Sequence, residues 1–193
     1  SNFPVGTTVN VFQITDIHGN MAVGSFEVHV RPLPSAAIQQ SDITCFGLNN
    51  GNLNLTVNGG TQPYIFDWSN GLNTEDISNL APGNYGVQIT DFYGCETAAS
   101  ATLVQPEAIS IDGISQNVSC YSGDNGNINI NVSGGIEPYS FLWNNGQQTE
   151  DINSLSAGSY ALVVTDYNGC TAGWIKEITQ PQPLTIQGTV ADA

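Results

Sequence analysis

Hydrophobic and polar residues alternate over many short stretches of the chain, which is the pattern of half-buried β-strands. Aliphatic residues take every second position in residues 53–57 and again in residues 128–132, with asparagine or threonine between them. Residues 64–68 carry Tyr64, Phe66 and Trp68 on one face of a further strand. One face of each strand is therefore predicted to be buried and the other wet, as in antiparallel sheets.

Turn signals separate these stretches. Gly59-Gly60 is predicted to reverse the chain, and Asn70-Gly71 is the strongest short signal for a hairpin. Leu80-x-x-Gly83-x-Tyr85 resembles the tyrosine corner that leads into one strand of immunoglobulin-like sandwiches. The pattern predicts an all-β protein built from Greek-key, immunoglobulin-like sandwiches of about seven short strands each.

The whole pattern occurs twice, with a shift of 75 residues and no insertion. Cys45 recurs as Cys120 (120 − 45 = 75), and Cys95 recurs as Cys170 (170 − 95 = 75). The aromatic strand, the Asn-Gly turn and the tyrosine motif follow the same shift. A partial third copy lies upstream, because Thr15-Asp16-x-x-Gly19-Asn20 precedes Thr90-Asp91-x-x-Gly94-Cys95 by 75 residues, with asparagine in place of cysteine. The chain is thus a tandem repeat.

The repeat sets the predicted domains. Residues 1–32 are the last strands of a preceding, related domain, residues 33–106 and 107–181 are the two repeats, and residues 182–193 are the first strand of a following repeat. Prolines at the junctions, as in residues 31–34, predict stiff linkers. We expect an elongated array in which each repeat contacts its neighbours in the same chain.

Composition and charge narrow the possible partners. The chain has 17 acidic residues against 2 Lys+Arg, a formal net charge of −15. Without a basic patch, neither nucleic acid nor anionic lipid is an expected partner. No apolar run approaches the 18 or so residues that would predict a membrane-spanning helix, so we expect no membrane insertion.

The four cysteines fall as one pair in each repeat. Because the pair is duplicated with the repeat, we predict disulfides Cys45–Cys95 and Cys120–Cys170 within the repeats. Their spacing fits no zinc site, since the repeats contain neither a CxxC motif nor histidine. The alternative is two buried free thiols in each repeat.

Five motifs, in the same order in both copies, resemble the SprB repeat of very large cell-surface adhesins in gliding Bacteroidota. In the first copy they are Cys-Phe-Gly-x-Asn-Asn-Gly (residues 45–51), Gly-Gly-x-x-Pro-Tyr, Trp-x-Asn-Gly, Leu-x-x-Gly-x-Tyr and Thr-Asp-x-x-Gly-Cys. The segment before them resembles the C-terminal part of an HYR-type domain. The resemblance implies export by the type IX secretion system, an extracellular location on the cell surface, and a structural or adhesive role in attachment and gliding motility.

No enzymatic chemistry is predicted. His18 and His29 both lie upstream of the repeats, and His29 is expected to be an ordinary strand residue. The carboxylates Glu75-Asp76 are copied as Glu150-Asp151, which indicates a structural turn, because a catalytic pair need not recur in every repeat.

Two kinds of ligand remain to be considered. Calcium prefers oxygen ligands, and Asp91, Asp166 and Asp124 in acidic or amide-rich turns are its candidate residues, although aspartate in such turns also bonds its own backbone. A carbohydrate-binding module that recognises surface polysaccharide through loops is the alternative function. Trp174, whose counterpart in the first repeat is Ala99, is its candidate exposed ring.

Overall fold

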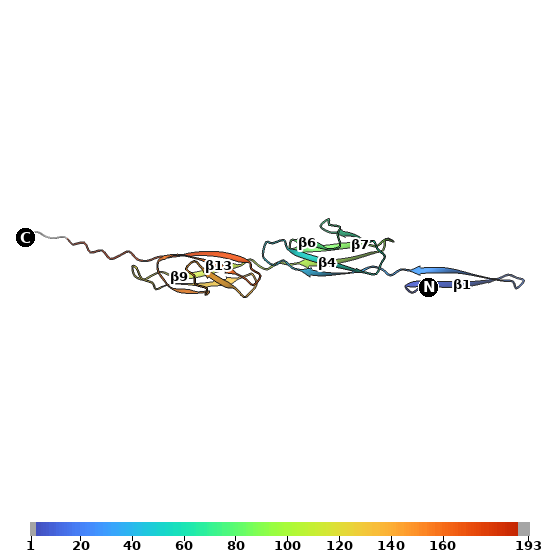
Figure 1. The fold of residues 1–193 in the computed structure, drawn as a ribbon, viewed down its shortest axis with the longest axis horizontal. Helices are drawn as coiled ribbons and strands as arrows, with labels where there is room; N and C mark the ends of the chain where they lie inside the picture. The colour runs from blue at the N-terminus through green and yellow to red at the C-terminus, as the bar shows by residue number, and fades with distance from the viewer. Residues whose placement is uncertain (1–2, 189–193) are drawn as a thin grey trace, which may run out of the picture. The chain divides into compact units, whose positions relative to one another are not determined.

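The computed structural model describes residues 3–188, and its secondary structure is entirely β. Strands β1 (Gly6–Thr15) and β2 (Met21–Val30) form a hairpin with paired ends Gly6–Val30 and Thr15–Met21 (Figure 1). Apolar side chains of this hairpin, among them Val11 and Met21, are exposed. Its assignment to an HYR-type domain stays a prediction.

Each repeat forms a sandwich of two three-stranded antiparallel sheets. In repeat 1 the strands are β3 (Ser35–Ser41), β4 (Gly51–Asn58), β5 (Ile65–Trp68), β6 (Ile77–Leu80), β7 (Gly83–Thr90) and β8 (Glu96–Leu103), in sheets β3-β4-β6 and β5-β7-β8. In repeat 2 they are β9 (Ser110–Gln116), β10 (Gly126–Ser133), β11 (Ser140–Trp143), β12 (Ile152–Leu155), β13 (Gly158–Thr165) and β14 (Thr171–Ile178), in sheets β12-β10-β9 and β11-β13-β14.

Each repeat therefore has six strands, where about seven are predicted. The sheets correspond to the three-stranded halves of an immunoglobulin sandwich without the strand between β5 and β6. Asn70-Gly71 does form a turn, in which Gly71 N–H donates to the Trp68 carbonyl at 2.8 Å. The predicted hairpin is nevertheless absent, because β5 pairs with β7 while β6 pairs with β4. Residues 69–76 connect β5 to β6 and contain no strand.

The core of each sandwich comes from the alternation seen in the sequence. In repeat 2, Trp143 is 1% exposed and packs with the aliphatic residues that β10, β12, β13 and β14 turn inward. The core of repeat 1 uses the residues 75 positions earlier, including Trp68, which is also 1% exposed. The Trp68 and Trp143 indole N–H groups donate to the Thr74 and Thr149 carbonyls at 2.8 and 3.0 Å. Both large rings are thus buried with their polar groups satisfied.

The tyrosine corner is present in both repeats. The Tyr85 hydroxyl donates to the Ala81 carbonyl at 2.9 Å, and the Tyr160 hydroxyl donates to the Ser156 carbonyl at 3.0 Å. These bonds fix the chain where it enters the central strand of the second sheet.

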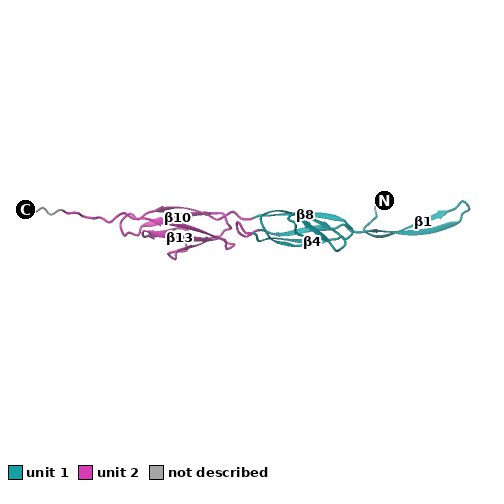
Figure 2. Cartoon of the chain, turned by 90° about the horizontal axis from the view of Figure 1, so that it is seen from above, with its two compact units in different colours: residues 1–42, 49–104 teal, residues 43–48, 105–193 magenta. Residues whose placement is uncertain are grey.

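The compact units differ from the predicted domain boundaries. Unit 1 contains residues 1–42 and 49–104, and unit 2 contains residues 43–48 and 105–193 (Figure 2). The segment 43–48 lies between β3 and β4 in the sequence, yet it belongs to unit 2. Residues 182–193 are predicted to be the first strand of a following repeat, but their described part, residues 182–188, forms no strand. The rest of that prediction, residues 189–193, lies outside the described residues.

Candidate functional site

Unit 2 contains one disulfide, and it joins cysteines from different repeats. Cys45 is bonded to Cys170, with an S–S distance of 2.00 Å and a Cα–Cα distance of 5.7 Å, whereas Cys95 and Cys120 are free. The predicted pairs Cys45–Cys95 and Cys120–Cys170 are therefore wrong.

The strand length explains why the two cysteines of one repeat do not pair. Each sandwich has a leading end, formed by the start of the first strand and the turn between the last two strands, and a trailing end, where the first strand runs into the second. In repeat 1 the leading end holds Cys95, and Thr61 N–H donates there to the Asp91 carboxylate at 3.0 Å. The trailing end holds Cys45, which follows β3. The seven residues of β3 separate the two ends by about 20 Å, whereas a disulfide needs Cα atoms within about 7 Å.

The turn that carries Cys170 is built around a buried aspartate. Asp166 is 5% exposed, and its carboxylate accepts backbone N–H bonds from Asn168 (2.9 Å), Cys170 (2.8 Å) and Ile136 (3.0 Å). The Asn168 side-chain amide then donates to the Thr44 carbonyl at 2.9 Å. The turn thus presents Cys170 to segment 43–48 within unit 2.

Asp91 builds the same turn in unit 1. It is 3% exposed and accepts N–H bonds from Tyr93, Cys95 and Thr61 at 2.9, 2.9 and 3.0 Å. The bond from the Cys95 N–H is the main cause that holds the pKa of Asp91 below its ordinary value of 3.8, while burial acts in the opposite direction. Asp91 and Asp166 therefore serve the backbone of their own turns.

The remaining calcium candidate lies elsewhere. Asp124 is exposed in the loop before β10. Among residues 3–188, no three His, Cys, Asp or Glu side chains gather in a way that would hold a metal ion. Calcium binding stays a prediction for these residues.

Of the carboxylate pair Glu75-Asp76, the aspartate has a structural role in both copies. Asp76 accepts the Leu55 N–H at 2.9 Å, and Asp151 accepts the Ile130 N–H at 2.9 Å. Each aspartate thereby holds the connection before β6 or β12 against the neighbouring strand.

Trp174 is not the exposed ring that the sequence suggested. It is half-buried on β14, and its ring lies edge-on against Trp143 with centroids 6.3 Å apart. A Cβ atom on Gly113 would lie 3.0 Å from the Trp174 ring, so this glycine gives the ring its space. In repeat 1, where Ala99 replaces the tryptophan, a shallow groove of about 750 Å³ lies beside Trp68, with Asp67, Gln88 and Ser100 among its lining residues.

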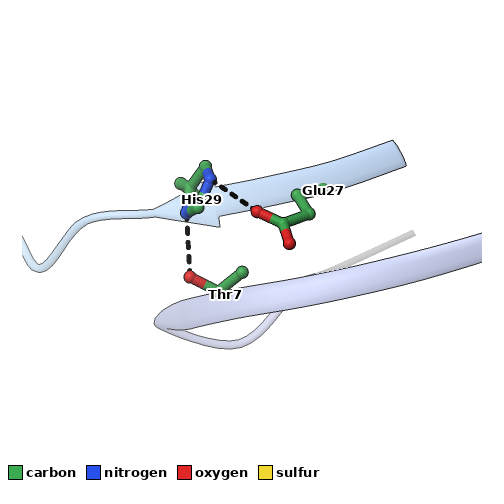
Figure 3. Close-up of polar contacts among 3 residues, drawn as sticks. All are labelled: Thr7, Glu27 and His29. Carbon is green, nitrogen blue, oxygen red and sulfur yellow. Dashed lines mark hydrogen bonds and ion pairs between the residues drawn. The ribbon is translucent and has the colours of Figure 1, made fainter. Parts of the chain in front are cut away.

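His29 lies in β2 as expected of a strand histidine. Its Nδ1 shares a hydrogen bond of 2.8 Å with the hydroxyl of Thr7, its cross-strand partner, and its Nε2 lies 3.3 Å from a Glu27 carboxylate oxygen (Figure 3). The order hydroxyl, imidazole, carboxylate resembles a catalytic triad. However, the His29 and Glu27 side chains are 58% and 57% exposed, so water surrounds them and they lack the dry environment that such a triad uses. We interpret the three residues as a cross-strand polar contact.

In residues 3–188 there is no helix of the length and apolarity needed to cross a membrane.

Comparison with known proteins identifies the repeats. The family model described as "SprB repeat" matches residues 37–73 and 113–148, one match in each sandwich. No curated protein matches the chain. Solved structures with a similar fold include the N-terminal eight Ig domains of Down Syndrome Cell Adhesion Molecule (DSCAM) isoform 1.30.30, at 15% identity and a TM-score of 0.50, over 92% of this chain and 28% of that one. The amphioxus IgVJ-C2 molecule matches at 15% identity and a TM-score of 0.32, over 79% of this chain and 99% of that one.

The chain thus spans 28% of the length of the DSCAM structure. At this identity the likeness shows the immunoglobulin-like fold alone.

Proposed function

Because the chain carries two SprB repeats, we propose that it is a structural and adhesive stalk segment of a large cell-surface adhesin. One observation carries the proposal. The same sandwich is built twice at an offset of 75 residues, with the same buried tryptophan, tyrosine corner and aspartate turn in each copy. A module that is copied with its interactions intact extends a chain in regular steps.

Charge and linkers support a stalk. The net charge of −15 opposes collapse of neighbouring repeats onto one another and keeps the chain away from anionic surfaces. Prolines at residues 32, 34 and 106 restrict the backbone between modules. The stalk would then hold a binding region away from the cell, or contribute many weak contacts that act together.

Small-angle X-ray scattering of the full chain tests the stalk. A compact protein of 193 residues has a radius of gyration of about 16 Å, so we expect a value well above this and an elongated envelope. A compact envelope would overturn the proposal.

The finer aspects of the proposal concern the cell. We propose that the protein lies outside the cell, is exported by the type IX system, acts in attachment and gliding, and catalyses no reaction. Antibodies against the two repeats should label intact cells of the source organism, and deletion of the repeats should impair attachment or gliding. Labelling only after the cells are permeabilised would contradict the surface location.

Carbohydrate binding is the second candidate function, and the groove in repeat 1 is the observation that favours it. Its lining offers the carboxylate of Asp67, the side-chain amide of Gln88 and the hydroxyl of Ser100, polar groups that can bind the hydroxyls of a sugar. A glycan array that shows no specific binding to bacterial surface polysaccharides would exclude this function.

A further inference from the structure

We propose that Cys120 is a disulfide site whose partner is the turn cysteine of a further SprB repeat that follows repeat 2. The bridge already present joins Cys45 of one repeat to Cys170 of the next. The 75-residue shift makes Cys120 the copy of Cys45 (120 − 45 = 75), and Cys120 is exposed and free.

The loop around Cys120 has the backbone conformation of the loop around Cys45. Leu48 N–H donates to the Cys45 carbonyl at 3.2 Å, and Gly123 N–H donates to the Cys120 carbonyl at 3.1 Å. The two loops therefore close in the same way, although only Cys45 is bonded.

A second bond anchors each loop to the linker that leaves its repeat. Gly47 N–H donates to the Gln105 side-chain oxygen at 2.8 Å, and Ser122 N–H donates to the Gln180 side-chain oxygen at 2.8 Å. The copy even keeps a positive φ of 60° at Ser122, where the first loop has 77° at Gly47. Since a serine rarely adopts this conformation, the loop geometry is fixed by its surroundings before any bridge forms.

The cavity at Cys45 and the cavity at Cys120 are separate, but one wall of each is built from equivalent residues. The pocket of about 350 Å³ at Cys45 is lined on one side by its own loop and residues 106–109, and on the other by Asp166 and residues 169–171 of the Cys170 turn. The cavity of about 520 Å³ at Cys120 is lined by residues 119–121 and 181–184, which are the copies of the first side. Within residues 3–188, no turn lines this cavity as the Cys170 turn lines the other. The Cys120 cavity thus has the wall that the cysteine loop provides in the bonded site, without the wall that the turn cysteine provides.

Cys95 carries the other half. Its turn has the same aspartate-centred hydrogen bonds as the Cys170 turn, but it lies at the leading end of repeat 1. Cys120 lies at the trailing end of repeat 2. Each repeat therefore has a loop cysteine at its trailing end and a turn cysteine at its leading end. This arrangement predicts a head-to-tail series of bridges along an array.

The bridge forms by thiol–disulfide exchange with a low-molecular-weight disulfide as oxidant. The thiolate of one cysteine attacks that reagent and releases one small thiol, and the second cysteine then displaces the other small thiol as the S–S bond closes. The two cysteines lose two electrons to the reagent, which leaves as two thiols that take up the two protons.

The inference rests on the array in the proposed function, and it is tested with the full chain extended by a copy of residues 119–182 after Ala193. In the 75-residue register Ala193 corresponds to Val118 (193 − 75 = 118), so the copy begins at the next position of the repeat. The copy carries Tyr167→Phe as a mass tag, because Tyr167 is exposed in the parent repeat. After refolding with a glutathione redox pair, peptide mapping without reduction should find Cys120 linked to the copied Cys170 beside the Cys45–Cys170 link.

The matched control replaces the copied Cys170 with asparagine, the residue found at Asn20 in the upstream turn. Alkylation of Cys120 in the folded, non-reduced protein should be at least about tenfold lower in the extended chain than in this control. A second extended chain ends in a copy of residues 44–107 and supplies the Cys95 turn instead. The proposal would be overturned if Cys120 stayed reactive in both extended chains. A bond from Cys120 to the original Cys95 or to the original Cys170, instead of to the copied turn cysteine, would also overturn it.

Scattering on the same proteins separates the two proposals. An elongated extended chain with a reactive Cys120 leaves the stalk intact and removes the bridge, whereas a compact chain removes the stalk whatever its bonds.

Discussion

Removal of the Cys45–Cys170 bridge should destabilise unit 2 and leave unit 1 almost unchanged. The change is the double substitution Cys45→Ser and Cys170→Ser, because both cysteines belong to unit 2. The bridge spans 125 residues, for which the chain-entropy model gives about 5 kcal/mol. If unit 1 stays folded while unit 2 unfolds, only residues 45–48 and 105–170 are flexible in the closed loop, and the effect falls to about 4 kcal/mol.

Hydrogen exchange with mass spectrometry and thermal unfolding can measure this loss. Each kcal/mol shifts the Tm of a domain of this size by roughly 4–8 °C, so we expect the Tm of unit 2 to fall by about 15 °C or more. Amides of β10–β14 should exchange faster, while those of β4–β8 keep their protection.

The control is the double substitution Cys95→Ser and Cys120→Ser, which removes the two free thiols. It should change stability by less than about 1 kcal/mol in the 193-residue chain. An unchanged unit 2 in the bridge variant, or an equal loss in both units, would refute the assignment of segment 43–48 and its bond to unit 2.

Three further predictions follow from single side chains. Tyr85→Phe removes the bond to Ala81 and should cost unit 1 about 1 kcal/mol in denaturant unfolding, with no change if the corner is unimportant. Because the pKa of Asp91 is lowered in the folded state, its contribution to stability is present above about pH 4 and is lost as the pH falls through the depressed folded value. The substitution Asp91→Asn should therefore make the Tm of unit 1 fall less steeply at acidic pH. An equally steep fall of the Tm in the variant would contradict this. Ala99→Trp should fill the groove in repeat 1 and abolish any glycan binding, whereas retained binding would place the sugar elsewhere.

The alternation of the sequence was sufficient to predict the sandwich and most of its core. Burial requires every second residue to face inward, so residues 53–57 and 128–132 could be assigned to strands without any knowledge of the partner sheets. The number of strands was not accessible in this way. It depends on which sheet each short segment joins, and the Asn70-Gly71 turn looks the same whether the flanking strands pair with each other or separate into two sheets.

The position of Trp174 could have been predicted from the alternation along its own strand, although the comparison of the two repeats suggested otherwise. Its counterpart is Ala99, which drew attention to the ring as an exception. Yet Trp174 has the same parity along β14 as the buried Ile178, so the period of two alone places it on the inner face. The strand pattern was the better guide, because sheet geometry acts on every residue of the strand.

The disulfide could not be assigned from duplication, because duplication fits two schemes equally well. A bond within each repeat and a bond from each repeat to the next both recur every 75 residues. The distance between the ends of a sandwich decides between them, and that distance follows from the seven residues of β3. Cysteines placed at opposite ends of a strand cannot meet in one repeat, whereas a short linker brings a trailing cysteine and the next turn into the same unit.

The aspartate turn indicates that the cysteine is an addition to a fold that does not need it. Asp16 in the β1–β2 hairpin accepts N–H bonds from His18 and Asn20 at 2.9 Å each, which are the bonds that Asp91 makes in repeat 1. The residue at the cysteine position there is Asn20, and its side-chain amide donates to Asp16 at 2.8 Å. Since the turn closes with asparagine as well as with cysteine, the local structure gives no reason for a thiol. The thiol acts instead at longer range, and in unit 2 its effect is the bond that holds segment 43–48 to the Cys170 turn.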